Sequence, residues 1–175
     1  MWRTLVLTAA VSLASLNALA VDTDTASGNP PPINGYYLAH DDKTGFVRAL
    51  MHLQENPQTG ELSAIISKIL PRPGYTPRII CTGCAGRYNN QPITGMNVFQ
   101  HVVRSHEKPT LYEGGKVLDP VSGRQYNALI TSSKNGDTIK VRGYLGVPLM
   151  GRTAYWMKTN DPERYLKAAD PIKGR

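Results

Sequence analysis

Apolar and polar side chains alternate with a two-residue period over most of the chain between Gly35 and Lys158. The segments 46–53, 126–130 and 139–145 each carry apolar residues at every second position. This period is that of a β-strand with one buried face, because successive side chains of a strand point to opposite sides. Patterns with a helical period are scarce before the C-terminus. The sequence therefore predicts an all-β protein.

Turn chemistry divides these alternating runs. The segments 42–45, 56–60, 119–123 and 135–137 combine Asp or Asn with a Gly that can adopt positive φ, which is typical of links between antiparallel strands. The pattern predicts strands near 35–41, 45–54, 61–70, 95–104, 111–118, 124–132, 137–145 and 152–158. A long Pro- and Gly-rich loop interrupts them from Pro71 to Pro92, and 161–175 is predicted to be a short helix or tail.

Antiparallel strands with short links must close on themselves or protect their edges. An eight-stranded up-and-down barrel satisfies this requirement and has room for packed side chains or one small ligand. A β-sandwich is the competing architecture. Small inward-facing residues would leave a cavity, whereas Leu, Met and Tyr would fill the lumen; the small candidates are Ala49, Ala64, Ala128 and Gly143.

The N-terminus has the three-part layout of a secretory signal peptide. A basic start at Arg3 precedes an apolar core, and the small residues before Val21 predict cleavage between Ala20 and Val21. Residues 21–33 resemble a disordered Pro/Gly-rich tether, and 34–160 form the predicted barrel domain. We expect no transmembrane segment in the mature chain.

The chain is basic, with 20 Lys and Arg against 13 Asp and Glu. Removal of residues 1–20 leaves 19 basic and 13 acidic residues, a net charge of +6. These charges are scattered, with no run of five or more Lys and Arg, so a solvated surface is the favoured interpretation and no nucleic-acid partner is expected.

The two cysteines are spaced as Cys81-x-x-Cys84 in the central loop. A redox-active pair requires a strand-to-helix context that the surrounding glycines do not provide, so an exported chain favours a static disulfide. A zinc site with His101 and His106 is the alternative, but oxidised cysteines cannot ligate zinc. The neighbours Ser105, His106 and Glu107 do not make a triad, and no catalytic motif occurs. We expect no metal, no cofactor and no enzymatic activity.

Several motifs, in order, resemble the bacterial family called "domain of unknown function 2147". They are 81–86, 92–96, 114–120, Gly123, Tyr126, 140–146, 151–153 and Trp156. The resemblance implies an exported protein of Gram-negative bacteria with a lipocalin-like barrel, located in the periplasm or secreted. The family often opens with Gly-x-Trp, whereas this chain has Gly35-Tyr36-Tyr37, and Lys158 stands where the family tends to have Arg. Tyr37 can still plug one end of a barrel.

Charged residues within the apolar strands are candidates for ligand contact. Arg142 and Arg152 must pair, reach water or meet a ligand carboxylate. Asp119 is one structural partner for them, and Lys116 and Gly123 belong to the same turn region. The candidate ligand-binding set is Arg142, Arg152, Tyr126, Trp156 and Tyr37.

Two functions are consistent with these features. The first is a monomeric, exported, non-enzymatic barrel that binds a small, mainly apolar ligand, with one acidic group met by Arg142 or Arg152. The second is an envelope interaction module that holds a protein partner by the barrel surface or the 71–92 loop, without a small ligand.

Overall fold

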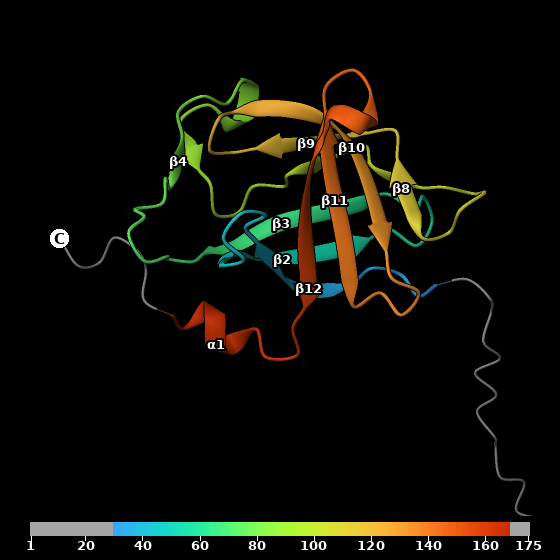
Figure 1. The fold of residues 1–175 in the computed structure, drawn as a ribbon, viewed down its shortest axis with the longest axis horizontal. Helices are drawn as coiled ribbons and strands as arrows, with labels where there is room; N and C mark the ends of the chain where they lie inside the picture. Colours follow the sequence, from blue (N-terminus) through green and yellow to red (C-terminus); the bar gives the residue numbers. More distant parts are fainter. Residues whose placement is uncertain (1–29, 169–175) are drawn as a thin grey trace, which may run out of the picture.

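The computed structural model describes residues 30–168 (Figure 1). The predicted signal peptide with its cleavage site at Ala20 and Val21, most of the predicted tether, and the end of the predicted tail lie outside the described residues. Residues 30–33 of the predicted tether are described, and Ile33 among them is fully buried.

Antiparallel pairing joins the strands in the order β3-β2-β1-β12-β11-β10-β8-β7. The N-terminal strands are β1 (Gly35–His40), β2 (Val47–Glu55) and β3 (Leu62–Ile69). The next are β6 (Phe99–Gln100), β7 (Val103–Arg104), β8 (Leu111–Glu113) and β9 (Lys116–Asp119). The last are β10 (Arg124–Ser132), β11 (Thr138–Tyr144) and β12 (Arg152–Lys158). β9 pairs with both β10 and β6.

Irregular hydrogen bonds between β3 and the segment 95–104 close the sheet. The amide of Leu62 donates to the carbonyl of Val102 at 2.8 Å, and that of Val98 donates to Ala64 at 2.8 Å. The chain therefore runs once around a ring in sequence order. The predicted eight-stranded up-and-down barrel is confirmed, and the sandwich alternative is wrong.

Two predicted strands, 95–104 and 111–118, are each broken near their middle. His101 has a positive φ of 54° between β6 and β7, and Gly114 has a φ of 81° between β8 and β9. A Cβ on Gly115 would lie 2.2 Å from the carbonyl oxygen of Gln100. The two kinks thus touch backbone to backbone, which requires a glycine at position 115.

Three turns share one design. Asp41, Asn56 and Asp119 each accept a hydrogen bond at the backbone carbonyl from a glycine four residues later, at 2.8 to 2.9 Å. Their side-chain oxygens also accept amide hydrogen bonds from within the turn. The first turn opens at Asp41, one residue before the predicted start, because the Asp41 carboxylate is the acceptor.

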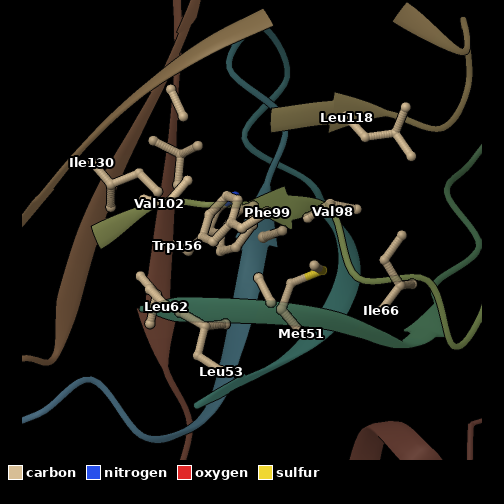
Figure 2. Close-up of a cluster of buried hydrophobic side chains, with 14 of the residues drawn as sticks. Met51, Leu53, Leu62, Ile66, Val98, Phe99, Val102, Leu118, Ile130 and Trp156 are labelled. Atoms are coloured by element: carbon tan, nitrogen blue, oxygen red, sulfur yellow. The ribbon is translucent and has the colours of Figure 1, made fainter. Parts of the chain in front are cut away.

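Buried apolar side chains fill one half of the lumen, and Figure 2 shows part of the cluster that they form around Phe99 and Trp156. The ring of Trp156 stacks on that of Phe99, with the centroids 5.4 Å apart and the planes 2° from parallel. Inward positions on the strands supply the remaining core, which includes Leu53, Leu62, Val102, Ile130 and Ile139. The face that carries Val47, Ala49, Met51 and Leu53 in the sequence pattern is therefore the inner one.

A buried polar cluster closes this end of the barrel. Arg104 donates to both carboxylate oxygens of Glu55, at 2.6 and 2.7 Å, and the hydroxyl of Tyr112 donates to Glu55 at 2.7 Å. Arg104 also donates to the carbonyls of Pro30 and Pro31, which ties down the incoming chain. We call this group, with Ile33, the closed-end cluster.

The central loop carries β4 (Ile80–Cys81), β5 (Gln91–Pro92) and the 3-10 turn η1 (Gly86–Tyr88). Cys81 and Cys84 form the predicted disulfide, which is confirmed. A second 3-10 turn, η2 (Pro148–Met150), lies between β11 and β12. Helix α1 (Glu163–Leu166) confirms the short helix predicted for the tail and lies near β3 (Figure 1).

Candidate functional site: a cavity at the open end of the barrel

The other half of the lumen is a cavity of about 540 Å³. It lies at the end where the 41–46, 70–98, 119–124 and 145–151 connections meet. In Figure 1 the last of these rises above β9, β10 and β11 at the top of the view. The volume falls within the range typical of small-ligand sites.

The floor and walls are apolar. Trp156 forms part of the floor, and apolar residues of six strands make the walls; they are Ala39, Ala49, Met51, Ile66, Ile69, Val117, Leu118, Val141, Gly143 and Ala154. The register between β2 and β3 shifts between Leu50 and Met51, so that Ile66 and Ile69 both face the lumen. Of the small residues considered above, Ala49 and Gly143 line the cavity, while Ala64 and Ala128 lie in the filled core.

Arg152 provides a cation at the rim. It shares the inner face of β12 with Ala154 and Trp156, and it is paired in register with Gly143. No carboxylate within residues 30–168 forms a salt bridge with it, and its side chain is exposed. Arg152 can therefore meet the acidic end of a ligand whose apolar part lies deeper.

Arg142 does not line the cavity, so we remove it from the candidate ligand contacts there. It lies on the opposite face of β11 and donates to the carbonyls of Pro148 at 2.6 Å and Leu149 at 2.9 Å, and to Thr153 Oγ1 at 2.7 Å. In the alternating segment 139–145, Arg142 lies on the face opposite Val141, and the structure shows that the face of Val141 is the inner one. Its role is to hold the η2 connection.

Asp119 lines the rim but does not pair with Arg142 or Arg152. Its carboxylate accepts from the amide of Val121 at 3.0 Å and from the hydroxyl of Ser122 at 2.7 Å. Asp119 therefore does not form the expected ion pair with either arginine, because donors within its own turn already satisfy its carboxylate. Lys116 donates to Asn127 Oδ1 at 2.5 Å, on a neighbouring strand.

Gly123 fixes the disulfide loop onto this turn. A Cβ at Gly123 would lie 2.0 Å from the carbonyl oxygen of Gly83, and one at Gly83 would lie 2.8 Å from that of Ser122. The backbones are therefore in direct contact. The predicted structural role of Gly123 is explained by this contact as well as by its positive φ of 73°.

The 71–92 loop supplies rim residues that the sequence did not reveal. Arg72 lies 4.1 Å from the centroid of the Tyr75 ring and donates to Asp41 at 2.9 Å. Burial alone would raise the pKa of Asp41. The amides of Thr44 and Lys43 and the charge of Arg48 stabilise the carboxylate more strongly, so the pKa is lowered to about 2. Arg78 lines the cavity nearby. No periodic pattern places a loop over a barrel mouth, so the sequence carried no signal for these residues.

Of the remaining candidate ligand contacts, Tyr126 and Trp156 line the cavity, and Tyr37 does not. Tyr37 is fully buried at the closed end, where its hydroxyl donates to the carbonyl of Gly136 at 2.6 Å. Burial, with a smaller contribution from Asp137, raises the pKa of Tyr37 to about 12. Tyr37 therefore plugs the closed end of the barrel and does not reach the cavity.

The considered zinc ligands are not brought together. Cys81 and Cys84 are disulfide-bonded, and His101 extends into solvent with 91% of its side chain exposed, 3.6 Å from Glu61. Across residues 30–168, no group of three or more His, Cys, Asp or Glu side chains is arranged to hold a metal ion. Within the same residues, no helix is long and apolar enough to cross a bilayer.

Comparison with known proteins agrees with this architecture. The profile of a bacterial family described as "Uncharacterized protein conserved in bacteria (DUF2147)" matches residues 35–158. Among solved structures, the chain is similar to HP1028 of the human pathogen Helicobacter pylori, described as belonging to the lipocalin family. The two share 18% identity and a TM-score of 0.59, over 77% of this chain and 88% of that one. No curated protein matches. The chain belongs to the DUF2147 family and has a lipocalin-like barrel.

Proposed function

We propose that this protein is an exported, non-enzymatic carrier that binds a small, mainly apolar molecule with one acidic group. The observation that carries the proposal is the cavity of about 540 Å³, which is apolar inside and has Arg152 at its rim. A lipocalin-like barrel agrees with a binding role, because an eight-stranded barrel has room for one small ligand. Export to the periplasm or beyond is proposed from residues 1–20.

The arrangement of polar groups favours an amphiphile over a wholly apolar ligand. The lower walls carry aliphatic and aromatic side chains, so burial of a hydrocarbon chain supplies most of the binding free energy. Arg152 is paired in register with Gly143, where Val117 and Tyr126 pack against the glycine, so its guanidinium lies at the rim above apolar walls. A carboxylate at the mouth would accept a charge-assisted hydrogen bond there.

The test compares two ligands of equal chain length, dodecanoate and dodecanol, by titration calorimetry. We expect dodecanoate to bind more tightly, and Arg152→Gln to weaken dodecanoate by about fivefold, because an exposed charge pair contributes modestly. Dodecanol binding should be unchanged by Arg152→Gln. Arg124→Gln is the control, since Arg124 lies in the same end of the barrel but does not line the cavity. Failure of both ligands to bind would contradict the proposal.

A protein-binding role for the 71–92 loop is the second candidate. Tyr75 and Ile79 of this loop are 40% and 39% exposed, which is the observation that favours it. Substitution of Ile79→Ser, which leaves the cavity lining intact, should then abolish capture of an envelope protein by cross-linking in the producing cell. Unchanged cross-linking would remove this candidate.

A further inference from the structure

Large exposed apolar side chains gather around the mouth of the cavity. Among residues 30–168, all of them except Tyr155 and Met157 lie in connections at the open end; they are Phe46, Tyr75, Ile79, Leu145, Val147, Leu149 and Met150. Leu149 and Met150 are 88% and 82% exposed. An exposed apolar group of this kind marks a contact surface.

The β11–β12 connection presents four of these residues, which we call the apolar lip: Leu145, Val147, Leu149 and Met150. The lip is held in place, because Arg142 donates to the carbonyls of Pro148 and Leu149 from the outer face of the barrel. The amide of Met150 also donates to Val147 at 3.2 Å. A fixed loop with outward apolar side chains loses little conformational entropy when it enters an apolar phase.

The lip is continuous with the cavity. Leu145 and Met150 line the lumen as well as the outer rim, whereas Val147 and Leu149 face only outward. An apolar molecule that leaves the cavity past the lip would therefore enter whatever apolar phase covers the lip. Along such a route the hydrocarbon stays out of water. This is favourable because each methylene exposed to water costs free energy.

The charges at the same end favour an anionic surface. Arg48 and Arg72 are engaged by Asp41, but Arg78 and Arg152 form no salt bridge with any carboxylate of residues 30–168. The carboxylate of Asp119 accepts two hydrogen bonds from Val121 and Ser122 within its own turn. Exposed apolar side chains beside basic ones are typical of proteins that bind at a membrane interface.

We propose that the open end of the barrel docks on an anionic phospholipid bilayer through the apolar lip, so that the ligand passes directly between the membrane and the cavity. The docking is argued from the lip and from the guanidinium groups of Arg78 and Arg152, which no carboxylate of residues 30–168 neutralises, and its purpose rests on the carrier function proposed above. A protein partner is the competing occupant and would be the remaining interpretation if lipid did not bind.

The test is sedimentation of the purified protein, produced from its full sequence, with two kinds of vesicle. One contains phosphatidylglycerol mixed with phosphatidylcholine, and the other contains phosphatidylcholine alone. We expect stronger binding to the anionic vesicles. Val147→Ser with Leu149→Ser should weaken binding by about tenfold or more, and Arg78→Gln should lower the preference for anionic vesicles by about fivefold. Met157→Ser, on the barrel wall, is the matched control and should bind like the wild type.

Absence of sedimentation, or equal binding of the wild type and the double lip variant, would overturn the proposal. The carrier function is tested separately, because Val147 and Leu149 do not line the cavity: the double variant should keep its affinity for dodecanoate in vesicle-free buffer. Loss of vesicle binding with dodecanoate affinity retained would confirm the lip as the docking element. Vesicle binding without dodecanoate binding would contradict the carrier function and the transfer route.

Discussion

Phe99 and Trp156 stack face to face within the buried cluster (Figure 2), at the boundary between the filled half of the lumen and the cavity. Trp156 lines the cavity, whereas Phe99 is buried among the side chains of the filled half. The filled half stabilises the fold, and the open half is free to hold a ligand. Substitutions in the two halves should therefore separate stability from binding.

The cavity should be blocked by Ala154→Phe. Ala154 lies on the inner face of β12 beside Trp156, so the added ring would occupy empty volume rather than displace the core. We expect dodecanoate to change the fluorescence of Trp156 saturably in the wild type and not in Ala154→Phe, with little change in melting temperature. Met157→Phe, on the outer face of the same strand, should bind normally. Full affinity in Ala154→Phe would place the ligand elsewhere.

The closed-end cluster should be a major source of stability. The side chains of Glu55 and Arg104 are only 6% and 17% exposed. Glu55→Gln leaves the Arg104 charge without its carboxylate, which should cost about 3 kcal/mol of unfolding free energy. Urea denaturation measures this change, and Glu163→Gln, from an exposed pair with Lys167, should cost much less. Equal small effects would show that the cluster contributes little.

Acid should weaken the fold through the same carboxylate. Burial alone would raise the pKa of Glu55. Hydrogen bonds from Arg104, Tyr112 and the amide of Ile33 stabilise the carboxylate more strongly, so the pKa is lowered from 4.5. The unfolded chain therefore binds a proton first as the pH falls through about 4.5, and stability declines below that pH. Asp41 adds to the loss between pH 3.8 and about 2. Glu55→Gln should unfold with a flatter pH dependence in this window; an unchanged slope would contradict this assignment.

Two glycines with the same backbone conformation should respond differently to substitution. Gly45 and Gly123 close similar turns, with φ of 72° and 73°. A Cβ at Gly45 meets nothing within 4 Å, so Gly45→Ala should cost about 1 kcal/mol from backbone strain alone. Gly123→Ala also pushes into the backbone of Gly83 and should cost about 2 kcal/mol more. Equal melting temperatures would mean that the disulfide loop moves away freely.

The sequence contained most of the barrel and only part of the site. Alternation and Asp/Asn-to-Gly turns identified the strands and their order because both are local. The kinks at His101 and Gly114 escaped prediction, since they arise where two distant backbones touch. From the sequence, Arg142 and Arg152 were equivalent candidates, because the inner face of the strands was not known. The structure distinguishes them: Arg152 lies on the same inner face of β12 as Trp156, and Arg142 lies on the outer face of β11. The rim residues of the 71–92 loop depend on how that loop folds over the mouth, which no periodicity encodes.

The central claim is that the open half of the lumen holds an apolar ligand. Native mass spectrometry of the protein recovered from the producing cell, beside a denatured run, tests it most directly. We predict a small-molecule adduct that is lost on denaturation and is absent from Ala154→Phe. Identical native and denatured masses in repeated preparations of the wild type would contradict the claim.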